Sequence, residues 1–164
     1  MTKPHLHALA AIALVTASVG CGDGNSNNGN VGCTVTLTGG ISASPACTSA
    51  VAAYTQATNQ SAITVLTTGT TPTVAATIAF TGTLHTGTYH GTDAGAVGGI
   101  AITQGANSWS AVAGGNGSIT VTLTSVSTVS STAQGTAYLV HGTWDATVPS
   151  SAQGGTAITF HATF

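Results

Sequence analysis

The amino-acid sequence predicts an all-β protein, built as an antiparallel β-sandwich. Charged residues that favour helices are nearly absent, since the 164 residues include one Lys or Arg and three Asp or Glu. Thr, Val, Ile and Gly dominate instead, and they favour strands and tight turns. Apolar and polar residues alternate with a period of two, which indicates antiparallel sheets covered on one face only. We expect about eight to ten strands in a Greek-key or jelly-roll-like order, with a closed barrel as the alternative.

Two segments precede the expected sandwich. Residues 1–20 have the plan of a signal peptide, with a basic start, an apolar stretch over residues 6–19 and small residues before Cys21. The apolar stretch is shorter than the roughly 20 residues that a membrane-spanning helix needs. Residues 21–32 are rich in Gly and Asn and predict a flexible tether. Residues 33–164 then form one β-sandwich domain, which is long enough to bury a core.

The alternation locates the strands within this domain. Gly, Asn, Ser and Pro separate the apolar segments and predict the turns between them. We expect strands near residues 33–39, 46–57, 61–68, 74–86, 98–104, 108–113, 117–127, 135–148 and 156–164. The alternation directs the following side chains into the core: Val35, Leu37, Ile78, Phe80, Leu84, Ile119, Val121, Leu123, Tyr138, Val140, Trp144, Val148, Ile158, Phe160 and Phe164.

The end of the leader resembles the lipobox of bacterial lipoproteins. Val19, Gly20 and Cys21 match that pattern, while Ser18 stands where Leu is usual. The chain is also similar to uncharacterised bacterial surface lipoproteins in three segments: TGTLHTGTY (residues 81–89), HGTWDATV (141–148) and TFHATF (159–164). The resemblance implies that Cys21 becomes the lipidated first residue of a mature protein at the outer membrane or cell surface. That family brings no known activity. Plain secretion, after cleavage near residue 17 or 20, is the alternative.

The cysteine count bears on both the anchor and the fold. The chain has three cysteines, an odd number for an exported protein. If Cys21 carries a lipid, Cys33 and Cys47 are left to pair in an oxidising compartment. Gly39 and Gly40 form a hairpin-turn signal, and counting outward from Gly40 places Cys33 opposite Cys47. The sequence therefore predicts a Cys33–Cys47 disulfide.

The short inventory of reactive groups argues against several functions. After Lys3 the chain has no Lys or Arg, so it offers neither a basic patch for nucleic acid nor a lysine for a phosphate-binding loop. A glycosidase needs two carboxylates beside the scissile bond, and within the sandwich only Asp93 and Asp145 could serve. The chain also contains no Gly-x-Ser-x-Gly motif, which would indicate a serine hydrolase. We therefore expect no enzyme activity, no catalytic residue, no cofactor and no nucleic-acid partner.

Histidines provide a candidate metal site. His141, Thr143 and Asp145 alternate along one expected strand and share its outer face. If the last two strands form a hairpin about residue 152, His161 lies next to Thr143 and diagonal to His141 and Asp145. Imidazole and carboxylate groups can bind zinc or copper, so His141, Asp145 and His161 are the candidate ligands. A second candidate set surrounds one turn: His85, His90 and Asp93. The simpler interpretation is that these are polar residues on solvated strand faces.

Aromatic residues are the candidate carbohydrate contacts. Trp144 falls on the apolar face by alternation, so we expect it in the core. Trp109 lies between Ser108 and Ser110 after a turn, and we expect it to be exposed, where it could stack on a sugar ring. The Thr-x-Thr runs invite comparison with ice-binding surfaces, but the chain has no fixed repeat. The abundance of Thr has a simpler explanation, because Thr is an uncharged polar residue with high β propensity.

The function expected from these features is non-enzymatic. We expect a cell-envelope lipoprotein, held at the membrane by its lipid, that displays a charge-poor β-sandwich for binding or surface coating. The alternative hypotheses are a carbohydrate-binding module using Trp109 and a metal-binding protein using the His/Asp cluster. The expected partners are a polysaccharide or an envelope protein. Self-association is a further expectation, because edge strands here lack the lysines that discourage sheet-to-sheet pairing.

Overall fold

The computed structural model describes residues 32–67 and 71–164, and within these ranges it confirms an all-β antiparallel fold. The predicted signal peptide and residues 21–31 of the predicted tether, Cys21 included, lie outside the described residues. No helix in the described ranges is long and apolar enough to cross a membrane. Ten strands occur there: β1 (Thr34–Gly39), β2 (Ser49–Thr55), β3 (Gln60–Leu66), β4 (Thr73–Thr81), β5 (Gly87–His90), β6 (Val97–Gln104), β7 (Asn107–Val112), β8 (Ser118–Ser131), β9 (Gly135–Val148) and β10 (Ile158–Thr163).

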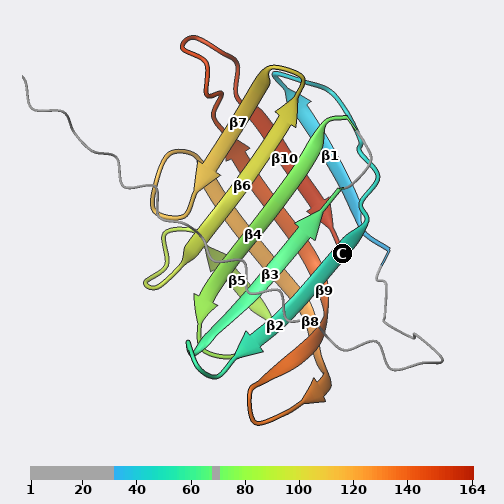
Figure 1. Cartoon of the computed structure of the whole chain (residues 1–164), viewed down its shortest axis with the longest axis vertical. Helices are drawn as coiled ribbons and strands as arrows, with labels where there is room; N and C mark the ends of the chain where they lie inside the picture. The colour runs from blue at the N-terminus through green and yellow to red at the C-terminus, as the bar shows by residue number, and fades with distance from the viewer. Residues whose placement is uncertain (1–31, 68–70) are drawn as a thin grey trace, which may run out of the picture.

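The strands form two crossed layers of one curled sheet (Figure 1). The front layer has the order β2-β3-β4-β6-β7, and the back layer has the order β1-β10-β9-β8-β5. The layers are continuous because β9 pairs with β2 of the front layer as well as with β8 and β10 of the back layer. The fold is therefore a sandwich whose two layers are joined through a shared strand.

Strands β8 and β9 bend where they pass between the layers. Residues 135–138 of β9 pair with β2, whereas residues 143–148 pair with β10. β8 follows β9 throughout, with two register shifts, the first of which lies just after Leu123 at the bend. Such bulges bend a strand and increase its twist. Gly142 faces Leu123 at this point, and a Cβ on Gly142 would clash with the carbonyl oxygen of Thr122. Glycine therefore permits the close strand approach at the corner.

One hydrophobic core fills the space between the layers. The residues expected to point inward are confirmed as buried, except for Tyr138, which is partly buried at the margin of the core. Trp144 and Phe160 meet edge to face at its centre, with ring centroids 6.0 Å apart. Each large apolar side chain that is fully buried contributes about 1.5–3 kcal/mol relative to exposure. The period-two alternation thus identifies the residues that drive folding.

The expected strand over residues 74–86 is wrong at its end. β4 stops at Thr81, and Gly82 turns the chain with a φ of 86°, a conformation that favours glycine. The chain then crosses to the back layer, where the unexpected short strand β5 pairs with β8. Leu84 is buried, but it lies in the connection between β4 and β5 and not in a strand.

The expected hairpin after Gly39 is only partly formed. Residues 40–48 meet β1 at two isolated bridges, Thr34 to Ala46 and Leu37 to Ala43, and the next strand begins at Ser49 rather than near residue 46. Proline has no N–H to donate, so Pro45 interrupts a regular ladder in this segment. The segment nevertheless lies along β1 and covers its outer edge.

The other edges of the sheet are covered to different extents. Residues 149–151 pair with the edge strand β7, where Ser110 N donates to the Pro149 carbonyl at 3.1 Å and Ser151 N donates to the Ser108 carbonyl at 2.9 Å. β5 covers the edge of β8 only as far as residue 123. Among the described residues, no strand pairs with the rest of that edge, residues 124–131.

Candidate functional site

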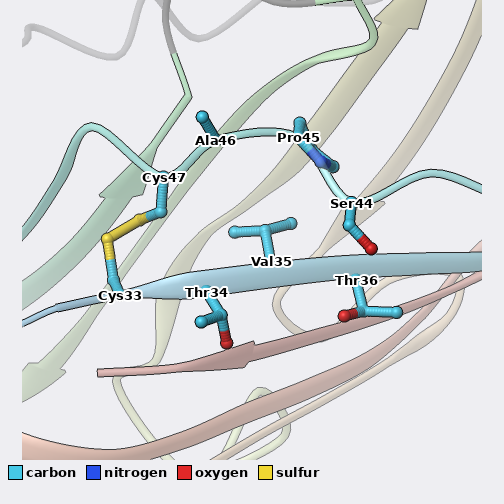
Figure 2. Close-up of a pocket in the computed structure, with 8 residues that line it drawn as sticks. All are labelled: Cys33, Thr34, Val35, Thr36, Ser44, Pro45, Ala46 and Cys47. Atoms are coloured by element: carbon cyan, nitrogen blue, oxygen red, sulfur yellow. A yellow bond between two sulfur atoms is a disulfide. The ribbon is translucent and has the colours of Figure 1, made fainter.

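The predicted Cys33–Cys47 disulfide is confirmed, and Figure 2 shows it joining the start of β1 to the facing segment. The two Cα atoms are 5.5 Å apart. The neighbouring bridge between Thr34 and Ala46 has the register that counting from Gly40 predicts. A hollow of about 490 Å³ lies beside the disulfide and is lined by residues 33–36 and 44–47. None of these side chains is a carboxylate or an imidazole, so the hollow holds no general acid or base.

The outward side of the back layer carries polar residues in regular cross-strand rows, and we call it the threonine face. One row contains a single residue from each of five strands, and all five are threonine: Thr88, Thr122, Thr143, Thr163 and Thr34. Hydroxyl groups of neighbouring residues meet within the row, at 2.6 Å between Thr34 and Thr163 and at 3.3 Å between Thr88 and Thr122. A further row is almost as uniform: Ser118, Thr147, Thr159 and Thr38. Sheet geometry spaces these side chains by roughly 4.8 Å across strands and 6.7 Å along them.

The row between these two holds the ionisable groups of the face. It contains His90, Thr120, Asp145, His161 and Thr36. His161 Nδ1 lies 2.6 Å from Asp145 Oδ1, and both side chains are about half exposed, at 43% and 56%. His90 Nδ1 lies 3.4 Å from the hydroxyl of Thr120. The structure thus places an exposed imidazole–carboxylate pair at the centre of an otherwise uncharged face.

The register predicted for the last two strands is wrong by two residues. His161 pairs with Asp145 directly, and Thr143 pairs with Thr163. The connection between β9 and β10 is displaced because its first residues, 149–151, pair with β7 before the chain turns back. Local counting could not include a pairing partner that lies about 40 residues earlier in the chain.

The three candidate metal ligands are therefore not brought together. His141 pairs with Ser125 at the bend, four residues from Asp145 on the same strand, which is roughly 13 Å in an extended chain. Within residues 32–67 and 71–164, no group of three or more His, Cys, Asp or Glu residues is placed to hold a metal ion. Only Asp145 and His161 of the predicted set are in contact.

The second candidate set is also divided between separate contacts. The His85 ring nitrogen Nδ1 contacts the Tyr89 hydroxyl, which also donates to the His85 carbonyl at 2.9 Å. Asp93 Oδ2 instead accepts from the backbone N–H of His90 at 2.7 Å, and Asp93 N donates back to the His90 carbonyl at 3.0 Å. Asp93 therefore stabilises the turn after β5, and His85 helps to anchor Tyr89 against the core.

The two carboxylates considered for a glycosidase belong to separate local contacts. Asp93 closes its turn, and Asp145 binds His161. A second hollow, of about 160 Å³, is lined by His90 and residues of the turn near Gly114, but neither carboxylate lines it or the hollow beside the disulfide. Neither of these two hollows therefore brings Asp93 and Asp145 together.

The expectation that Trp109 is exposed is wrong. Trp109 is 6% exposed, and its Nε1–H donates to the Thr156 carbonyl at 2.9 Å. Its position on the inner face of β7 follows the same alternation that buries Ala111. The neighbouring serines were a misleading signal, because on an alternating strand they mark the opposite face. Trp144 is fully buried, as predicted.

The outward side of the front layer differs in character from the threonine face. Three of its valines are well exposed, Val51 at 57%, Val97 at 49% and Val112 at 56%. Cross-strand neighbours there are mostly small, such as the row Ala53, Ala62, Ala79 and Val97. The two outer faces thus differ in degree: the threonine face carries aligned hydroxyl rows, whereas the front face mixes Ala, Val and Gly with Thr and Ser, including the Thr64–Thr77 pair.

Comparison with protein-family models, curated proteins and solved structures finds no match for this chain. Its function must therefore be argued from its own residues. Sequence reasoning compared the outward threonines with ice-binding surfaces but set the comparison aside because the chain has no fixed repeat, so it assigned the threonine face no role. The signal for this face was the Thr-x-Thr runs, but their alignment into rows depends on which strands are neighbours.

Proposed function

We propose that this chain is a non-enzymatic lipoprotein of the cell envelope, anchored through Cys21, whose sandwich serves for binding or for coating the surface. The observation that carries the proposal is the threonine face, with five aligned threonines in one row. Hydroxyl groups both donate and accept hydrogen bonds, and they are not charged. Such a surface suits an uncharged, hydroxyl-rich partner, so an envelope polysaccharide is the partner we favour over a protein.

The arrangement of the ionisable groups supports a binding role over a catalytic one. Asp93 is held by backbone contacts and Asp145 by His161. An acid and a base need to approach the same reacting atoms, and these two carboxylates belong to different local contacts. The structure also weakens the two alternative hypotheses, a carbohydrate-binding module and a metal-binding protein, because the residues on which they were based are not placed as expected. The carbohydrate module was based on an exposed Trp109, and the metal site on a cluster that included His141.

The proposed anchor has a direct test. Cells should incorporate labelled palmitate into the wild-type protein and not into the Cys21→Ser variant, because the thiol is the attachment point. Protease added to intact cells should degrade the anchored protein if it is displayed outward. Release of both forms into the medium without label would refute the anchor and favour plain secretion.

The proposed binding face needs its own test. The double variant Thr122→Val/Thr143→Val replaces two hydroxyls of the threonine face by methyl groups of similar size. The matched control is Thr64→Val/Thr77→Val, which changes a hydroxyl pair on the front layer whose oxygens are 3.1 Å apart. Retention of the protein on beads carrying polysaccharide from the native envelope should fall for the first variant only. Equal retention of both variants would contradict the assignment of this face.

A further inference from the structure

The exposed edge of β8 is a second surface with a definite chemistry. Beyond residue 123, β8 has β9 on one side and no described strand on the other. Figure 1 shows the β8–β9 hairpin extending past the lower end of the front layer. Residues 127–131 are all exposed, and Val129 is exposed to 61%. The backbone of this edge is therefore accessible to another strand.

This edge contrasts with the other long edges of the described sheet. The disulfide-linked segment lies along β1, and residues 149–151 pair with β7. The outer edge of β5 is open but short, at four residues. Residues 124–131 form the longest uncovered edge in the described ranges, about 27 Å for eight residues at 3.4 Å each.

The edge carries one register shift, between Thr128 and Ser130, but it lacks the charged residues and prolines by which proteins usually prevent sheet-to-sheet pairing. Residues 124–131 contain only Thr, Ser and Val, with no charge and no proline. In an antiparallel strand, alternate residues direct their N–H and C=O groups to opposite sides. About half of these eight residues therefore present both groups toward the open side, where a strand could accept and donate hydrogen bonds.

We infer that this edge of β8 pairs with the same edge of a second copy of the chain, antiparallel and about a two-fold axis. Two identical antiparallel edges are self-complementary, so outward N–H groups meet outward C=O groups along the regular part of the edge. Pairing brings no like charges together, because the described carboxylates, Asp93 and Asp145, lie outside the edge. Asp145 pairs with Thr120, four residues before the edge begins. A partner peptide of another protein would gain only the same backbone contacts, whereas a second copy supplies the matching length.

The size of the contact sets its strength. An edge 27 Å long and about 10 Å thick buries on the order of 500 Å² in total, which is below the 1,200 Å² or more of stable complexes. The dimer is therefore weak and depends on concentration. Anchoring in a membrane would raise the local concentration, but the pairing itself does not depend on the proposed anchor.

The test uses the full chain carrying Cys21→Ser, so that no lipid contributes to association. Sedimentation equilibrium from about 10 μM to about 1 mM, a range that covers weak affinities, should show a reversible monomer–dimer equilibrium. Thr128→Lys places a charge on the open edge, near its own symmetry mate, and should weaken dimerisation at least tenfold. The matched control is Thr103→Lys on β6, a residue that is also exposed but whose strand is paired on both sides. This control should dimerise like the parent.

Hydrogen exchange on the parent protein locates the contact without a variant. Amide exchange in residues 124–131 should slow as concentration rises, while exchange in β5 stays unchanged. A monomer at all concentrations would overturn the inference. So would a loss of dimer in Thr103→Lys with no loss in Thr128→Lys, because that result would assign association to the front layer. Either failure leaves the threonine-face and palmitate tests unaffected.

Discussion

Removing the Cys33–Cys47 disulfide is the perturbation whose effect can be worked out most directly. The cysteines are 14 positions apart, so the bond closes a loop of about 15 residues. On the chain-entropy model, closing such a loop stabilises the folded state by about 3 kcal/mol. The free energy of unfolding of Cys33→Ser/Cys47→Ser should therefore fall by that amount.

Urea unfolding measures this change. For a small protein the urea slope is about 1–3 kcal/mol per molar, so the unfolding midpoint should fall by roughly 1–3 M. The local effect should be largest in residues 40–48, which are otherwise joined to β1 mainly through the paired hydrogen bonds of Leu37 and Ala43, at 2.8 and 3.0 Å. Amide exchange at Ala43 should accelerate more than exchange in β4.

Two results would refute this reasoning. An unchanged midpoint in the double variant would show that the disulfide does not reduce the conformational entropy of the unfolded chain by the expected amount. Free Cys33 and Cys47 thiols in exported protein, detected by mass spectrometry, would remove the bond itself. The control is Cys21→Ser, which lies in the tether and should leave the midpoint unchanged.

Five further outcomes are expected. Trp109→Phe should lower the free energy of unfolding by about 1 kcal/mol beyond its packing loss, because it removes a partly buried hydrogen bond. Trp144→Phe should cost less than its lost volume suggests, because the Trp144 Nε1 is buried without a hydrogen-bond partner in the described structure; equal losses in urea unfolding of the two variants would contradict both expectations. Gly142→Ala should destabilise by roughly 1–3 kcal/mol, since its Cβ meets the carbonyl of the neighbouring strand; an unchanged melting temperature would count against the corner geometry. Asp145→Asn should change stability by less than about 1 kcal/mol, because the pair it breaks is half exposed; a larger loss in thermal unfolding would indicate a structural role. Trypsin should leave the mature chain uncut even in denaturant, since the one Lys or Arg of the full sequence is Lys3, in the predicted leader; fragments on mass spectrometry would show otherwise.

Local patterns accounted for the strands and for the core. Period-two alternation identifies inward residues such as Leu37 and Phe160 without knowledge of the neighbouring strand, because the pleat alone directs side chains to opposite faces. The disulfide was also predictable, since the turn at Gly39 and Gly40 lies between the two cysteines. Over so short a loop, counting residues outward from the turn leaves little room for an error in strand register.

Predictions that needed a distant neighbour were less successful. The register of β9 against β10 was misplaced because residues 149–151 pair with β7. The exposure of Trp109 was misjudged because its flanking serines and the turn before it suggested a surface position, whereas β7 packs its inner face on the core. β5 was missed because four residues carry too little alternation to be recognised.

The sequence by itself determined the fold class, the residues of the core, the shortage of charged groups and the disulfide. Each of these depends on composition or on residues close together in the chain. The tertiary structure decided which outward residues became neighbours. Thr34 and Thr163 are 129 positions apart, yet their hydroxyls meet at 2.6 Å because β1 and β10 pair. The threonine face and the open edge of β8 exist for the same reason: strand order and register are set by packing of the whole sheet, which no local pattern encodes.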